Sequence, residues 1–228
     1  VICGAVDFCL VEPIVAGFAT MNGAYQPKQG QAPEPPARAS RPFSIDRRGF
    51  VISEGAGCLI ATTEAFARRN GLSCDIALAG WSMTSDAQHF VAPNLATVTR
   101  CIAEAIADAG LQPADVDAVN AHGTSTRIGD TVEAQALAQI FGHRPPPVSA
   151  NKSMTGHAMG ASSAIETILA IEGMQRGLLL PTINYTPDPD LALDLVTEGT
   201  RRQEQEFILK NAFGFGGCNS CIILHRQG

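Results

Sequence analysis

The stretch Val116-Asp117-Ala118-Val119-Asn120-Ala121-His122-Gly123-Thr124-Ser125-Thr126 contains the pattern that decides the fold. Its first six residues are mostly apolar and predict a buried strand. A polar turn follows, and residues 131–141 then carry apolar side chains at helical spacing. Because strand, polar turn and helix recur along the chain, the sequence predicts an α/β fold with a mixed sheet.

The same pattern assigns most of the remaining elements. We expect further strands at 1–6, 57–62, 76–83, 147–150, 207–213 and 220–225, and further helices at 63–70, 94–109 and 158–173. The last two strands flank Gly214-Phe215-Gly216-Gly217 and predict a hairpin. Strands 1–6 and 57–62 are expected to be buried, and the small-residue helix 158–173 to be buried on all sides. The Pro-rich stretch 26–42 predicts a surface connection.

Composition excludes several classes of protein. Of the 228 residues, 45% are hydrophobic and 17% charged, which excludes general disorder. The net charge is −6 and no basic run exceeds two residues, so a broad nucleic-acid or anionic-membrane surface is not expected. Apolar runs are far shorter than the ~20 residues that a bilayer needs. We therefore expect a cytoplasmic protein without membrane insertion. Because Val1–Val6 reads as an uncapped strand, we also expect the chain to begin inside a larger fold.

The seven cysteines do not indicate a disulfide framework, because their number is odd and the chain is large. We expect buried, free thiols. Cys218-Asn219-Ser220-Cys221 is a CxxC motif, but a zinc site typically needs a second pair. No metal is therefore expected. A metal-binding module of Cys218, Cys221 and His225 is kept as an alternative that elemental analysis would test.

Three polar clusters follow predicted strands, where ligands collect in α/β folds. The first is 120–126 with His122, the second is 151–157 with Lys152 and His157, and the third is the glycine loop 211–217. A cation close to a histidine disfavours the imidazolium form, so Lys152 is expected to keep His157 neutral. Glu166 is expected to face back toward this cluster. Neither a GxSxG elbow nor a GxxxxGK[ST] phosphate loop is present.

Taken together, these clusters resemble the C-terminal half of a β-ketoacyl-acyl-carrier-protein synthase of the synthase II kind. Arg41-Pro42-Phe43, Ser85-Asp86-Ala87 and Pro181-Thr182-Ile183-Asn184 match as well, in family order over essentially the whole chain. The resemblance implies a thiolase-like fold, an α-β-α-β-α layered sandwich of two similar halves. Residues 1–49 would end the N-terminal half and add the Pro-rich connection, and residues 50–228 would form the C-terminal half.

The resemblance also implies the reaction and its partners. It implies a decarboxylating Claisen condensation of an acyl-enzyme with malonyl-acyl-carrier protein, in fatty-acid or polyketide-type synthesis. The family's nucleophilic Cys lies upstream, outside this chain. No bound cofactor is implied, because phosphopantetheine arrives on the acyl carrier protein. The implied partners are that carrier protein, an upstream ketosynthase half, and a second ketosynthase-like subunit in a homodimer or heterodimer.

Individual roles follow from the resemblance residue by residue. His122 and His157 would be the catalytic histidines that stabilise the malonyl enolate, with Lys152 ordering the site and Phe215 gating it. Substrate contacts are implied for Thr124, Thr126, Phe18, Phe213 and Asp86, and structural support for Glu166, Asp130 and Glu133.

Two other functions within the fold are weighed against this one. A chain-length-factor-like partner subunit would be non-catalytic, but such partners commonly lose the active-site residues, whereas both histidine clusters and Lys152 are present here. A thiolase-like coenzyme A condensing enzyme is the second, and the pattern His122-Gly123-Thr124-Ser125-Thr126 favours a carrier protein over coenzyme A.

Overall fold

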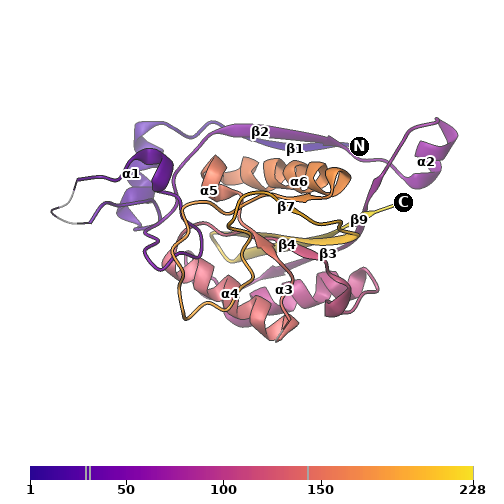
Figure 1. The fold of residues 1–228 in the computed structure, drawn as a ribbon. Helices are drawn as coiled ribbons and strands as arrows, with labels where there is room; N and C mark the ends of the chain where they lie inside the picture. Colours follow the sequence, from indigo (N-terminus) through magenta and orange to yellow (C-terminus); the bar gives the residue numbers. More distant parts are fainter. Residues whose placement is uncertain (29, 31, 143, 228) are drawn as a thin grey trace.

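The computed structural model describes residues 1–28, 30, 32–142 and 144–227, so Gln29 and Gln31 of the predicted Pro-rich connection lie outside the described residues. Figure 1 shows a layered arrangement. The antiparallel pair β1 (Ile2–Asp7) and β2 (Gly55–Ile60) lies on one side of α6 (Met159–Arg176). A five-stranded sheet lies on the other side of α6, and two helices cover its far face: α3 (Leu95–Asp108) and α4 (Arg127–Phe141).

The five-stranded sheet has the order β3-β9-β8-β4-β5. Its strands are β3 (Ile76–Ser85), β9 (Cys218–Arg226), β8 (Phe207–Gly214), β4 (Ala118–Asn120) and β5 (Val148–Ser149). Strand β4 runs parallel to both β5 and β8, whereas β9 is antiparallel to β8 and β3. The mixed sheet and the β8–β9 hairpin are therefore as predicted. The carboxyl ends of β4 and β5 meet at one edge, which brings the polar turns after them together.

Two apolar cores hold the sheet between its helices. On the α3 and α4 side, Ile102, Leu137 and Leu209 are fully buried in one cluster. On the α6 side, Met174 and Ile208 belong to a second cluster. Ile208 and Leu209 are neighbours in β8 and point to opposite faces, as side chains alternate along a strand. This double burial explains the nearly continuous apolar run of the strand.

Helix α6 lies between the two sheets, but the expectation that it is buried on all sides holds only in part: six of its 18 residues are buried, and Glu172 and Arg176 near its end are exposed. The predicted boundaries of α4 need correction: the helix begins at Arg127, not at 131. Apolar spacing does not reveal this start, because the first turn of the helix is polar. Its Asp130 points inward and accepts hydrogen bonds from backbone N–H groups of the preceding loop. Several short elements complete the chain: α1 (Glu12–Thr20), α2 (Glu64–Arg69), α5 (Lys152–Thr155), β6 (Leu178–Leu179), β7 (Arg201–Arg202) and the 3₁₀ turns Pro36–Arg38 and Pro113–Asp115.

The expectation that strands 1–6 and 57–62 are buried is wrong for this chain. The exposed fractions of Ile2, Val6 and Ile60 are 77%, 75% and 83%. Helix α6 packs against only one face of the β1–β2 pair, which leaves the other face open. An apolar sequence run indicates that a strand can be buried on both faces, but the second covering layer has to come from elsewhere.

The cysteines are free, but the expectation that they are buried holds for three of the seven. Cys9, Cys101 and Cys221 are buried, whereas Cys3, Cys58, Cys74 and Cys218 are exposed. Two of the exposed thiols, Cys3 and Cys58, belong to the β1–β2 pair. Within the described residues, no helix is both long and apolar enough to cross a membrane.

Gly80 provides a test of how closely α3 packs on the sheet. It lies at an irregularity of β3, and a Cβ atom there would stand 2.5 Å from Ala109 N and 2.7 Å from Ala105 O. We expect Gly80→Ala to lower the free energy of unfolding by about 1–3 kcal/mol, because backbone atoms of α3 would have to move. Gly17→Ala is the matched control, since nothing lies within 4 Å of that Cβ position. Urea denaturation of both variants measures the difference, and equal midpoints would contradict the prediction.

Candidate active site

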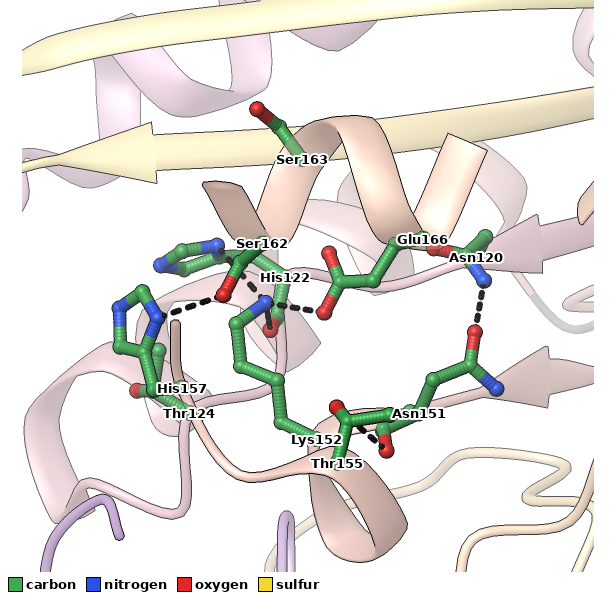
Figure 2. A network of polar contacts seen from close by, with 12 residues as sticks. Asn120, His122, Thr124, Asn151, Lys152, Thr155, His157, Ser162, Ser163 and Glu166 are labelled. Atoms are coloured by element: carbon green, nitrogen blue, oxygen red, sulfur yellow. Dashed lines mark hydrogen bonds and ion pairs between the residues drawn. The ribbon is translucent and has the colours of Figure 1, made fainter. Parts of the chain in front are cut away.

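Two imidazoles meet at the edge of the sheet where β4 and β5 end. His122 follows β4, and His157 follows the short helix α5 after β5. Their ring centroids are 5.6 Å apart and the ring planes stand at 85° to each other (Figure 2). Phe50 packs edge-on against His157 at 5.2 Å, and Phe213 lies 5.6 Å from His122. The parallel pairing of β4 and β5 thus joins two clusters that lie about 30 residues apart in the sequence.

Lys152 lies directly beside the first histidine. Its Nζ donates to the backbone oxygen of His122 over 2.6 Å and to Glu166 Oε1 over 2.5 Å, and it lies 3.5 Å from His122 Nδ1 (Figure 2). The side chains of Lys152 and Glu166 are each 1% exposed. Glu166 projects from α6 back toward the turn, as the sequence predicted.

A second buried lysine was missed by the sequence analysis. Lys210, in the middle of β8, places Nζ 2.8 Å from Glu166 Oε2, and its side chain is 2% exposed. A single charged residue inside the apolar run 207–213 was the available signal, because a lysine is almost never fully buried unless it is paired.

Both imidazoles are neutral at physiological pH. Burial, together with the charges of Lys152, His157 and Lys210, lowers the pKa of His122 well below 6.5. Burial and the two lysines lower the pKa of His157 in the same way. The sequence indicated the nearby cation, but desolvation by burial is the larger cause of the lowered pKa of His157. Burial raises the pKa of Glu166, yet the two lysines outweigh it and hold that pKa below its usual value.

The neighbours of each Nδ1 atom bear on where the ring proton lies. Nδ1 of His122 faces the Lys152 ammonium group, so it presents a lone pair and the ring proton is on Nε2. Nδ1 of His157 lies 3.0 Å from Ser162 Oγ. When that hydroxyl donates to Nδ1, the proton of His157 is also on Nε2. Both rings line the same cavity, so with both protons on Nε2 the site offers two neutral N–H donors to one ligand.

Two buried carboxylates shape the His122 turn. Glu133 accepts from the backbone N–H groups of His122 and Gly123, each over 2.8 Å, and from Asn211 Nδ2 over 3.0 Å. Asp130 Oδ1 accepts from the next two backbone N–H groups. Burial raises the pKa of Glu133, and it raises that of Asp130 to about 7. Both residues lie where structural support was predicted.

A cavity of about 790 Å³ opens in front of the two rings. Its lining includes four of the five predicted substrate contacts, Phe18, Thr124, Thr126 and Phe213, together with the predicted gating residue Phe215. The hydroxyl oxygens of Thr124 and Thr126 are 2.9 Å apart. Phe215, at the tip of the β8–β9 hairpin, is 43% exposed and lies 6.0 Å from Phe18 of α1.

Asp86 is the predicted contact residue that the structure does not bring to this cavity. Its carboxylate is buried and accepts from Asn94 N over 2.8 Å, from Asn219 Nδ2 over 2.6 Å and from Thr97 Oγ1. Its backbone N–H also donates to Gly217 O over 2.9 Å. Asp86 therefore ties the segment after β3 to the β8–β9 hairpin, and its oxygens are already occupied.

The alternative metal module receives no support from the geometry. Cys218 and Cys221 alternate onto opposite faces of β9, and His225 stacks on Phe207 at 4.4 Å. Among the described residues, no three His, Cys, Asp or Glu side chains gather as a metal site would require.

Comparisons with known proteins agree with this geometry. Residues 76–186 match the family model described as beta-ketoacyl synthase, C-terminal domain. The 3-oxoacyl-[acyl-carrier-protein] synthase 2 of Mycobacterium bovis is 39% identical over 228 residues, which cover 99% of this chain and 54% of that protein. This chain therefore spans about half the length of the curated relatives that it matches.

Solved structures show the same similarity. One is a type II PKS acyl-carrier protein in complex with its ketosynthase bound to the hexaketide, with a TM-score of 0.94 at 32% identity, covering 100% of this chain and 56% of that one. Another is the ishigamide ketosynthase/chain length factor, with a TM-score of 0.90 at 31% identity, covering 100% of this chain and 54% of that one. The fold of this chain is therefore that of the ketosynthase class of thiolase-like proteins, and the paired histidines agree with it. Within that class, this chain contains the C-terminal domain of a β-ketoacyl synthase, and the resemblance inferred from the sequence is confirmed.

Proposed function

We propose that this chain supplies the decarboxylating part of a β-ketoacyl-acyl-carrier-protein synthase active site. The observation that carries the proposal is the pair of half-buried, neutral imidazoles, His122 and His157, which line one cavity with their ring planes nearly perpendicular. The whole reaction would be a condensation of an acyl-enzyme with malonyl-acyl-carrier protein. The nucleophilic Cys would come from an upstream segment that is not among these residues.

In the proposed reaction, the two Nε2–H groups donate to the thioester carbonyl oxygen of the malonyl group. When the carbon–carbon bond to the carboxylate breaks, carbon dioxide leaves and the electron pair moves onto that oxygen as an enolate. Preorganised neutral donors stabilise this developing charge in a water-poor site. The enolate carbon then attacks the acyl-cysteine carbonyl, and the cysteine thiolate leaves. The products are a β-ketoacyl-carrier protein and carbon dioxide.

The remaining cavity residues fit the path of the substrates. Thr124 and Thr126 would bind the phosphopantetheine arm, which arrives on the acyl carrier protein, so no resident cofactor is required. Phe18 and Phe213 would contact the acyl chain or the thioester, and Phe215 would gate the entrance from the hairpin tip. The proposal includes a second ketosynthase-like subunit, as a homodimer or heterodimer, in the cytoplasm. The experiment is to assemble this chain with its upstream half and to measure radiolabelled acyl transfer and carbon dioxide release.

A chain-length-factor-like role is the second candidate, because one similar structure is a ketosynthase/chain length factor. A non-catalytic partner has no use for a buried, charged network behind two neutral histidines. The intact Lys152–Glu166 pair therefore favours the catalytic function. An assembled protein that takes no acyl label and releases no carbon dioxide would favour the partner role instead.

The lowered histidine pKa values predict an unusual pH dependence. The active rings are neutral, so the rate of malonyl decarboxylation falls only when the pH drops through their pKa, which lies well below 6.5. We expect kcat at saturating substrate to stay flat from about pH 8 down to pH 6.5, where an ordinary histidine is half protonated. Stopped-flow release of carbon dioxide across this range is the measurement. An acid limb centred at pH 6.5 or above would contradict the assignment of neutral donors.

A further inference from the structure

The second lysine behind the histidines has no role in the function proposed so far. Lys210 points to the α6 side of the sheet because it alternates with Leu209, which packs on the opposite face, and shares its face with Ile208. Helix α6 presents Glu166 to that face. The ion pair of 2.8 Å between them therefore forms between the central strand and the helix above it.

Glu166 is shared by two lysines, one at each of its carboxylate oxygens. Its Oε1 accepts from Lys152 over 2.5 Å, and its Oε2 lies 2.8 Å from Lys210 Nζ. Lys210 also donates to the backbone oxygen of Asn211. All three charged side chains are at most 2% exposed, and replacing a buried ion pair by apolar residues is often neutral or stabilising for a fold. A second buried lysine is therefore poorly explained by stability alone.

We propose that Lys210 is a positioning residue of this active site: it binds the second oxygen of Glu166 and so holds Lys152 in place beneath His122. Held there, Lys152 faces Nδ1 of His122 and keeps the ring proton on Nε2, on the cavity side. The network also carries two ammonium groups and one carboxylate. The two ammonium groups favour neutral rings and an anionic enolate over protonated rings. This inference rests on the proposed function and adds a residue to it.

Asp130 of α4 binds the turn after His122, and Arg48 and Arg127 line the same cavity as the rings. Four further charged groups surround the rings or their turns. They are Lys152 of α5, Glu166 of α6, Lys210 of β8 and Glu133 of α4. Lys210 is one of the causes that lower the pKa of both His122 and His157. Removal of this charge therefore raises the pKa of the rings. Because the neutral ring is the active form, the acid limb of the activity profile then moves to higher pH.

The experiment compares Lys210→Met, which removes the charge, with Lys210→Arg, which keeps it. Lys28→Met is the matched control, because it removes the same charge from an exposed site. Two readouts are used on the full chain assembled with its upstream half: NMR titration of ¹⁵N-labelled histidine rings, and the pH profile of kcat for malonyl decarboxylation. In Lys210→Met we expect both rings to titrate about one pH unit higher, the size expected from loss of a nearby charge. The acid limb should shift equally, with KM little changed.

The positioning role is supported if the histidine rings of Lys210→Arg titrate as in the unchanged chain and if Lys28→Met has no effect on that titration. A folded Lys210→Met protein whose rings titrate as in the unchanged chain overturns it, because a purely structural lysine would not move those titrations. If Lys210→Met does not fold, Lys210→Gln keeps a donor for Glu166 without the charge and is judged by the same criterion. The ring titration does not depend on turnover. Absence of decarboxylation in the unchanged protein would therefore contradict the proposed function and still leave the role of Lys210 testable.

Discussion

Replacing either His122 or His157 by Ala is expected to lower the rate of malonyl decarboxylation by at least about 100-fold, the usual cost of removing one donor to a developing oxyanion. In the proposed reaction, each ring offers one Nε2–H to the cavity that both rings line. Acyl transfer should remain largely intact, because in the proposed function the acylated cysteine comes from an upstream segment and the two rings act on the malonyl group. The measurement is radiolabelled carbon dioxide release beside acyl-enzyme labelling in the same assembled protein.

The matched control is His225→Ala, since that ring stacks on Phe207 at the far end of β9 and lies outside the cavity lining. The double variant His122→Ala/His157→Ala should decarboxylate little more slowly than the slower of the two single variants, because the effects of residues that act as a unit are not additive. Unchanged decarboxylation in both single variants would remove the basis of the proposed function. A parallel loss of acyl labelling would instead indicate that the rings act before condensation.

Glu166→Ala is expected to lower the free energy of unfolding by about 3–5 kcal/mol, the typical cost of breaking a buried ion pair by removing one partner. Lys152 and Lys210 would both lose the carboxylate that they share, at sites that are at most 2% exposed. Water cannot replace that partner without opening the contact between α6 and the sheet. Urea denaturation, read by circular dichroism, measures the change.

Glu172→Ala is the matched control on the same helix. Glu172 pairs with Arg176 over 2.6 Å, but their side chains are 50% and 68% exposed. Exposed pairs of this kind contribute about 0.2–1 kcal/mol, so the midpoint should hardly move. Equal destabilisation by the two variants would show that the buried network is no more important to the fold than a surface pair.

The sequence also predicted that the two histidine turns come together, and this prediction rests on patterns within short stretches of the chain. The run 116–121, the polar turn after it and the helix beyond it are each recognisable from apolar spacing alone. Their order places His122 and His157 at the same edge of a parallel pair, which is a general property of α/β folds. The turn of Lys152, the hairpin with Phe215 and the inward side of Glu166 were predicted for the same reason.

Other features depended on contacts between distant segments. The sequence could indicate that Lys210 interrupts an apolar run, but only the packing of α6 on β8 brings Glu166 to it. Likewise, Asp86 was expected to contact the substrate, yet its carboxylate oxygens accept hydrogen bonds from Asn94, Thr97 and Asn219. Hydrogen-bond partners of this kind come from residues up to 133 positions away, which no local pattern encodes.

By itself, then, the sequence determined the α/β class, the order of most strands and helices, and the two histidine turns, because these follow from apolar periodicity and turn chemistry within short windows. The tertiary structure alone decided how the charges are shared and which faces are covered. It showed one carboxylate held between two buried lysines, and a β1–β2 pair with an open apolar face. Burial and pKa depend on every segment that surrounds a group, and those segments meet only when the chain folds.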